Sequence, residues 1–180
     1  NDLGIDNKPI IGVVGRLRWE KGQDIVLDAM PEVIKAIPNV MLLVVGDGPD
    51  KEKLKNKAKE LGIKNHIIWM GQMDYDEVIK LYTIMDVVVI PSRFEGFGLS
   101  AAEAMAAGVP VIASAVDGLM EIIEDGKTGY LVPVNNSGEL AQALIKLLNN
   151  PERAQTMGLN GAERVKKMFS FEHFSESTLA

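Results

Sequence analysis

Hydrophobic residues in this chain of 180 residues form short apolar runs that alternate with longer amphipathic segments. The runs are rich in Val and Ile, which predicts buried strands at 10–14, 40–45, 66–70, 86–90, 111–113 and 130–132. The amphipathic segments have helical spacing, which predicts helices at 25–37, 50–61, 74–85, 99–107, 137–149 and 152–168. A short helical turn is expected at 121–124, and Pro31 is expected to kink the first helix.

Strands that alternate with helices in this way indicate an α/β fold. We expect a Rossmann-like, doubly wound parallel sheet of about six strands with helices on both faces. The length fits a single domain over residues 1–180. Ligands of such sheets bind at the carboxyl ends of the strands. The loops that follow strands should therefore form one site, and they comprise residues 15–22, 71–73, 91–98 and 114–118.

The composition narrows the class of protein. Hydrophobic residues make up 47% of the chain and charged residues 24%, as in ordinary globular domains, and a net charge of −6 argues against general nucleic-acid binding. The absence of cysteine excludes disulfides and cysteine-based metal sites. No run is long enough to span a membrane and no signal peptide is present, so we expect a cytoplasmic location. The chain begins at Asn1 rather than Met, which suggests a fragment or a processed chain.

The segment 93–106 carries the clearest chemical signal. It follows a predicted strand, passes through Gly96 and Gly98, and continues into an Ala-rich helix from Leu99. Glycines without a Cβ let a ligand approach the backbone closely. The free N–H groups at the start of a helix attract anions, of which phosphate is the commonest. This segment is therefore a candidate phosphate site.

Two carboxylates bracket that candidate site. Glu95 lies in the glycine loop, and Glu103 lies one turn after Leu99 on the same helix face, with its side chain leaning toward the helix start. A carboxylate repels phosphate but accepts hydrogen bonds from sugar hydroxyls. Either glutamate alone would be an ordinary turn or surface residue. Together they indicate a ligand with anionic and hydroxyl-rich parts, such as a nucleotide or a nucleotide sugar.

Several motifs in a fixed order resemble one protein family. They are Gly-Arg-Leu at 15–17 with Glu-Lys-Gly at 20–22, Val-Gly-Asp-Gly-Pro at 45–49, Pro-Ser-Arg-Phe-Glu-Gly-Phe-Gly at 91–98, and Glu-Ala-Met-Ala-Ala-Gly-Val-Pro-Val-Ile-Ala-Ser at 103–114. Over about residues 10–169 the chain resembles the C-terminal, donor-binding domain of the retaining glycosyltransferases of group 1 (GT4). The resemblance implies one half of a GT-B fold.

The resemblance also implies roles for individual residues. Arg16 and Lys21 would grip the diphosphate of a nucleotide-sugar donor and stabilise the leaving group without a metal ion, and Glu95 would hold hydroxyls of the donor sugar. Glu103 would hold the ribose. Further donor contacts are implied for Gly15, Met70, Gly96, Phe97, Gly98 and Leu99. The donor is the only small-molecule partner implied, and no separate cofactor is expected.

The chain departs from the family in two respects. After Ser114 the family has a Gly-Gly-x-Pro-Glu turn, whereas this chain has Asp-Gly-Leu-Met-Glu at 117–121, so contacts by Asp117 and Gly118 stay open. The N-terminal domain that carries the acceptor site in the family is missing here. The domain alone should therefore bind donor weakly and transfer little, and peripheral membrane association stays open for the full-length protein. The tail from Phe171 resembles the start of a segment that returns to that domain.

Other functions compete with this interpretation. Gly96-x-Gly98-x-x-Ala101 also fits a dinucleotide fingerprint with Asp117 downstream, which would indicate an oxidoreductase. Five residues separate Ile90 from Gly96, however, and the strand is not the first of the sheet, so this alternative is weaker.

A non-catalytic nucleotide-sugar binding module is the second alternative. The Asp-Tyr-Asp at 74–76 mimics a metal motif, but we interpret it as a helix cap. The base, the sugar and the acceptor stay open.

Overall fold

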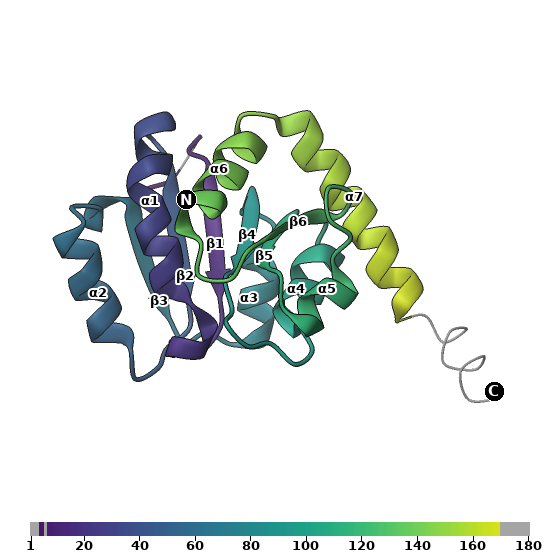
Figure 1. The fold of residues 1–180 in the computed structure, drawn as a ribbon, viewed down its shortest axis with the longest axis horizontal. Helices are drawn as coiled ribbons and strands as arrows, with labels where there is room; N and C mark the ends of the chain where they lie inside the picture. The colour runs from purple at the N-terminus through teal and green to yellow at the C-terminus, as the bar shows by residue number, and fades with distance from the viewer. Residues whose placement is uncertain (1–3, 6, 170–180) are drawn as a thin grey trace.

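The computed structural model describes residues 4, 5 and 7–169 (Figure 1). These residues form a parallel sheet of six strands in the spatial order β3-β2-β1-β4-β5-β6. The strands are β1 (Ile10–Val14), β2 (Met41–Val45), β3 (Ile67–Gly71), β4 (Val87–Ile90), β5 (Val111–Ser114) and β6 (Gly129–Val132). The strand order reverses between β1 and β4, which is where doubly wound sheets bind ligands. The predicted fold class is confirmed.

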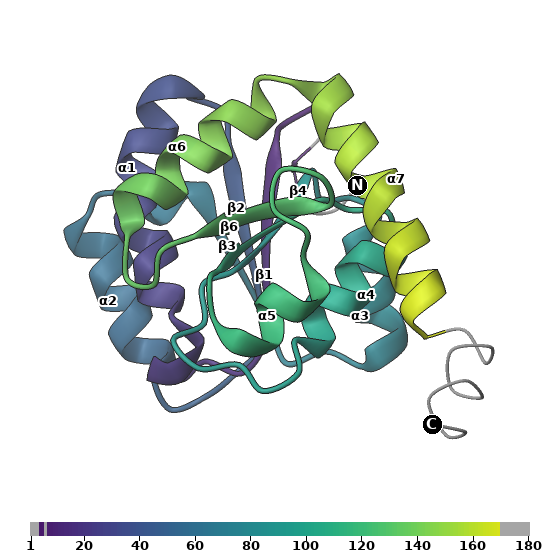
Figure 2. The ribbon, with the colours of Figure 1, turned by 45° about the vertical axis from the view of Figure 1, so that its right-hand side comes forward.

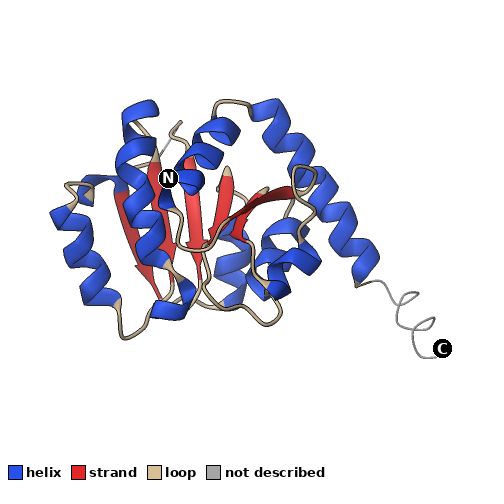
Figure 3. Ribbon diagram, in the orientation of Figure 1, coloured by secondary structure: helices blue, strands red, loops and turns tan. Residues whose placement is uncertain are grey.

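Helices cover both faces of this sheet (Figures 1 and 3). They are α1 (Gln23–Ala36), α2 (Lys51–Glu60), α3 (Tyr75–Tyr82), α4 (Leu99–Ala106), α5 (Asp117–Ile122), α6 (Ser137–Leu148) and α7 (Pro151–Met168). Short 3-10 turns, η1 (Trp19–Lys21) and η2 (Lys64–His66), join some elements. None of the helices in the described part of the chain is long and apolar enough to cross a membrane.

The core has two halves because successive strand residues point to opposite faces. On β1, Ile11 and Val13 pack into the half that α1, α2 and α6 cover, whereas Ile10 packs into the half that α3, α4 and α5 cover. The central strands β1, β2 and β4 are buried on both sides, which explains their continuous apolar runs.

One expected helical turn lies at a different position in the structure. The helical turn expected at 121–124 is the helix α5, Asp117–Ile122, so the second half of the predicted 114–118 loop is helical. Asp117 places a carboxylate in the first turn, where the helix dipole favours it, and Leu119 is buried beside Ile122 on one helix face. At Pro31 the structure shows an exposed residue inside the uninterrupted helix α1. The predicted 15–22 loop contains the turn η1.

The cap expected at Asp74 is confirmed. Asp74 and Glu77 form a reciprocal capping box at the start of α3, in which the Glu77 carboxylate accepts from the Asp74 backbone N–H at 3.1 Å. Within the described residues, no group of three or more His, Asp or Glu side chains is arranged to hold a metal ion.

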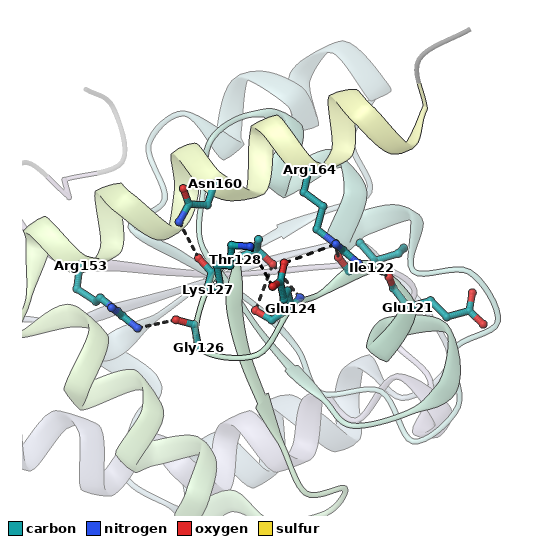
Figure 4. A network of polar contacts seen from close by, with 9 residues as sticks. All are labelled: Glu121, Ile122, Glu124, Gly126, Lys127, Thr128, Arg153, Asn160 and Arg164. Carbon is teal, nitrogen blue, oxygen red and sulfur yellow. Dashed lines mark hydrogen bonds and ion pairs between the residues drawn. The ribbon is translucent and has the colours of Figure 1, made fainter. Parts of the chain in front are cut away.

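Helix α7 runs beside α4 (Figure 2) and is anchored by polar side chains to backbone carbonyl groups at the end of α5 and in the α5–β6 connection (Figure 4). Arg164 donates from Nε to the Ile122 carbonyl at 2.6 Å and from Nη2 to the Glu121 carbonyl at 2.9 Å. Asn160 donates to the Lys127 carbonyl at 3.1 Å. These bonds connect α7 to the helix α5, which in turn supports the candidate site.

The close packing of α7 on the segment after α4 gives a first testable prediction. A Cβ at Gly158 would lie 1.9 Å from the Gly108 carbonyl oxygen, so Gly158→Ala should destabilise the fold by about 2 kcal/mol although Ala favours helix. Gly138→Ala in the first turn of α6 is the control, because its nearest neighbour would be 3.6 Å away. Urea unfolding measures both, and equal stability of the two variants would contradict the packing argument.

Candidate functional site

A pocket of about 270 Å³ lies at the carboxyl ends of β1 and β4, against the start of α4. The loop after β1, the loop after β4 and the first turns of α4 all contribute side chains. The polar and charged residues that line it are Arg16, Lys21, Gln23, Ser92, Glu95, Ser100 and Glu103. Of the four loops that the sequence predicts to form one site, the loops 15–22 and 91–98 line this pocket together with the start of α4, whereas the loops 71–73 and 114–118 do not line it.

A larger pocket, of about 500 Å³, lies elsewhere, between the segment before β1 and the junction of α6 and α7. Among the described residues that line it, Lys8 is the only cation, and its ammonium group donates to the Gly4 carbonyl at 2.9 Å. Among the helices of eight or more residues in the described chain, α7 alone begins at this pocket, and its first residue, Pro151, has no backbone N–H group to offer to an anion. The smaller pocket is therefore the better anion site.

The loop after β1 brings Lys21 to the pocket. Residues 19–21 form η1, which ends at Gly22 in the left-handed region with φ of 68°. A Cβ at Gly22 would lie 2.0 Å from the Pro91 carbonyl oxygen, so only glycine lets this loop touch the loop after β4. Arg16 is exposed beside the pocket, and no carboxylate among the described residues pairs with its guanidinium group.

The loop after β4 brings Glu95 to Lys21. The Lys21 ammonium lies 2.8 Å from Glu95 Oε2, and the buried Ser92 hydroxyl donates to the same oxygen at 3.1 Å. The Glu95 side chain is 12% exposed and that of Lys21 is 33% exposed. A partly buried ion pair of this length is stronger than a surface pair. The carboxylate is thus held in place by two donors, and the ammonium keeps further donors for a ligand.

Arg93 joins the two loops behind this pair. Its guanidinium group makes two hydrogen bonds to Asp24, at 2.9 and 2.8 Å, and others to the Trp19 carbonyl and to Asn135 Oδ1. Burial alone would raise the pKa of Asp24, but the hydrogen bonds and charge of Arg93 outweigh it and lower that pKa below its ordinary value of 3.8. Arg93 therefore works as a structural clamp between the two loops.

Helix α4 begins at the pocket. Its N-cap residue is Gly98, with φ of 72°, and no side chain caps the helix there. Leu99 and Ser100 line the pocket, which leaves the positive end of the helix dipole directed at it. Glu103 reaches the same pocket from the second turn, where the buried Tyr82 hydroxyl donates to its Oε2 at 3.2 Å.

Helix α5 supports the glycine loop from behind. A Cβ at Gly118 would lie 2.6 Å from the carbonyl oxygens of both Glu95 and Gly96, so a larger residue would displace the loop. Gly118 thus has a packing role within the protein, beside the glycine loop. Asp117 is exposed at the start of α5.

Gly15 also lines this pocket, whereas three other predicted donor contacts, Gly96, Phe97 and Met70, are not among the residues that line it. Phe97 is 57% exposed, and its ring lies 6.0 Å from that of Phe169. Gly96 is exposed beside it. Met70 is half-buried and packs against the core. A neighbouring pocket of about 470 Å³ shares Arg16 and is lined by Gln72 rather than Met70 at the end of β3.

Four residues of the site lacked an assigned role in the sequence analysis: Gln23, Ser92, Arg93 and Ser100. Gln23 is buried and donates to the Arg16 carbonyl at 3.0 Å, and Ser92 is 1% exposed. A polar residue two positions after a buried strand, as at Ser92, is the signal that could have revealed one of them. Arg93 and Gln23 gave no local signal because their partners are distant in the sequence or belong to the backbone.

Fold and pocket together define an α/β domain with an anion site bordered by carboxylates at the switch point of its sheet. Residues 1–164 match the family model of group 1 glycosyl transferases, and the chain belongs to this family. The predicted family and the Rossmann-like domain expected as one half of a GT-B fold are thereby confirmed. The chain spans less than half the length of the curated relatives it matches.

Individual relatives agree with this assignment. A GDP-mannose-dependent α-(1-6)-phosphatidylinositol monomannoside mannosyltransferase of Mycolicibacterium smegmatis is 34% identical over 165 residues, covering 88% of this chain and 43% of the relative. The structure of HepE of Anabaena in complex with UDP-glucose has a TM-score of 0.88 at 28% identity, covering 98% and 49% of the two chains. The C-terminal domain of a group 1 glycosyl transferase of Francisella tularensis has a TM-score of 0.86 at 34% identity, covering 94% and 90%.

The Arg93–Asp24 clamp predicts a pH-dependent stability. Because the pKa of Asp24 is lowered in the folded state, its contribution is fully present above pH 3.8 and is lost as the pH falls through the lower folded value. Asp24→Asn should therefore cost about 1–2 kcal/mol of unfolding free energy at pH 7, allowing for partial exposure, and much less near pH 3. Urea titrations at both pH values measure this, with Glu60→Gln at the far end of α2 as control. An equal cost at both pH values would contradict it.

Proposed function

We propose that this chain is the donor-binding domain of a glycosyltransferase that transfers a hexose from a nucleoside diphosphate sugar, with retention of anomeric configuration and without a metal ion. The observation that carries the proposal is the convergence of Arg16, Lys21, the start of α4 and the carboxylates of Glu95 and Glu103 on one pocket. Donor and acceptor would meet between this domain and a second, N-terminal domain.

The anionic part of the donor suits the cationic side of the pocket. Two oxygens of a diphosphate would accept hydrogen bonds from Arg16 and Lys21, and the uncapped start of α4 would add backbone N–H groups. These groups would stabilise the negative charge that develops on the departing nucleoside diphosphate. The metal-independent part of the proposal rests on this supply of positive charge from the chain itself.

The hydroxyl-rich part of the donor suits the carboxylates. Glu95 is held at the pocket by Lys21 and Ser92, so its second oxygen, Oε1, has capacity to accept from hydroxyls of the transferred sugar. Glu103 lines the same pocket from the second turn of α4 and would accept from the ribose. We expect the anomeric configuration to be retained because the chain resembles the retaining glycosyltransferases of group 1. We assign no residue as a covalent nucleophile.

The ligands of the relatives support this donor class. The mannosyltransferase of Mycolicibacterium smegmatis is GDP-mannose-dependent and the HepE structure is a complex with UDP-glucose, and both ligands are nucleoside diphosphate hexoses. The base therefore differs between relatives while the diphosphate and hexose are shared. A non-catalytic nucleotide-sugar module is the second candidate, and it is favoured only if the full-length protein binds donor without transferring it.

Ligand-observed NMR on this chain tests the proposal. The panel contains UDP, GDP, ADP, their glucose conjugates and NADH. We expect one nucleoside diphosphate and its sugar to bind, and Lys21→Ala and Glu103→Ala each to weaken binding about tenfold, as expected for a lost charged hydrogen bond. Lys59→Ala and Glu60→Ala, exposed at the far end of α2, are charge-matched controls. Binding of NADH alone, or no donor bound by the full-length protein, would overturn the proposal.

The Lys21–Glu95 pair generates a separate prediction. A nucleoside diphosphate without its sugar brings negative charge to a lysine that is already paired with Glu95 at 2.8 Å. Glu95→Gln keeps the size and hydrogen bonding of the side chain but removes its charge, so the free diphosphate should bind about three- to tenfold more tightly, roughly 1 kcal/mol, while sugar transfer falls. Calorimetry with wild type and Glu95→Gln measures this. Weaker or unchanged diphosphate binding would show that the pair does not oppose the phosphate.

A further inference from the structure

Tyr82 is a buried residue whose hydroxyl group has one hydrogen-bond partner among the described residues, and that partner, Glu103, belongs to the candidate site. It is the last residue of α3, and its side chain has no exposed surface. Its ring lies in the core half that α3, α4 and α5 cover. The hydroxyl donates to Glu103 Oε2 at 3.2 Å. A tyrosine that is needed only for packing could be replaced by phenylalanine, so the hydrogen bond is the feature that requires an explanation.

The hydroxyl can act only as a donor to this carboxylate. Burial raises the pKa of Tyr82, and the adjacent negative charge of Glu103 raises it further, so the phenol stays protonated at every physiological pH. Among the described residues, Tyr82 is the only group that donates a hydrogen bond to the Glu103 carboxylate. The bond therefore selects one rotamer of a side chain that otherwise rotates about three bonds.

The orientation has a consequence for ligand binding. Oε2 is engaged by Tyr82 from the core side, while Glu103 also lines the pocket at the start of α4. Oε1 then carries unused acceptor capacity in a defined direction. An acceptor that is already oriented loses less conformational entropy when a ligand binds.

We propose that Tyr82 is a positioning residue that orients Glu103 to accept hydrogen bonds from the vicinal ribose hydroxyls of the donor nucleotide. This inference rests on the proposed function of the pocket and adds to it a determinant of ribose specificity. Tyr82 does not touch the ligand. It acts through Glu103, so its loss should affect only ligands that carry the ribose hydroxyls.

The test compares two ligands and several variants. The ligands are the nucleoside diphosphate that the chain binds and its 2′,3′-dideoxy analogue, which lacks both ribose hydroxyls. For wild type we expect at least tenfold tighter binding of the ribonucleotide by calorimetry. Tyr82→Phe should weaken ribonucleotide binding three- to tenfold and change binding of the dideoxy analogue less than twofold. Glu103→Ala should abolish the discrimination, and adding Tyr82→Phe to it should have no further effect.

Controls separate this role from a structural one. Tyr130→Phe removes a phenolic hydroxyl from a half-buried residue of β6 that is not among the residues lining the pocket, and it should leave the binding of both ligands unchanged. If Tyr82→Phe keeps the wild-type ratio between the two ligands, whether both affinities fall together or neither falls, the inference is overturned. Failure of the full-length wild-type protein to bind any of UDP, GDP and ADP would overturn the proposed function and this inference with it.

Discussion

The candidate site depends on direct contact between the backbones of two loops. The loop after β1 and the loop after β4 belong to neighbouring strands, and the Arg93 N–H donates to the Glu20 carbonyl at 2.8 Å across them. Gly22 permits this approach because a side chain there would overlap the Pro91 carbonyl group. Lys21 and Glu95, 74 residues apart in the sequence, form an ion pair because their backbones are joined immediately beside them.

The contact also explains how the site brings opposite charges together. Two cations, Arg16 and Lys21, and two carboxylates, Glu95 and Glu103, line the pocket, so their formal charges cancel. A ligand with a diphosphate and hydroxyl groups would satisfy both signs of charge, whereas a bare anion or a bare polyol would satisfy only one. Selectivity for a molecule that carries both parts is therefore a property of the arrangement rather than of any single residue.

Much of the fold could be predicted because it depends on local patterns. Apolar runs buried on both faces mark β1, β2 and β4, and the capping signal at Asp74 marks the start of α3. The helix α5 was misplaced because its first turn contains Gly118, which a local pattern assigns to a loop. The position of α5 is determined by the packing of Gly118 against the glycine loop, and a sequence pattern does not show such a contact.

The same distinction applies to the site. Glu95 and Glu103 could be identified because they lie in a glycine loop and near a helix start, and Arg16 and Lys21 because their motifs resemble those of the family; all four line one pocket. The residues that orient them could not be identified from local spacing. Ser92 lies in the same loop as Glu95, but Arg93 acts on Asp24 and Asn135, and Tyr82 reaches Glu103 from another helix. Such partners depend on tertiary packing and become visible only in three dimensions.

The support of the site extends beyond the loops to the end of the described chain. Arg164 of α7 binds the carbonyl groups of Ile122 and Glu121 at the end of α5, and Gly118 at the start of α5 lies against the carbonyl groups of the glycine loop. A displacement of α7 would therefore move α5. Because Gly118 touches the Glu95 carbonyl group, α5 cannot move toward the glycine loop without displacing Glu95. Because hydrogen bonds and close backbone packing resist small distortions, α7 and the position of the Glu95 carboxylate are mechanically linked.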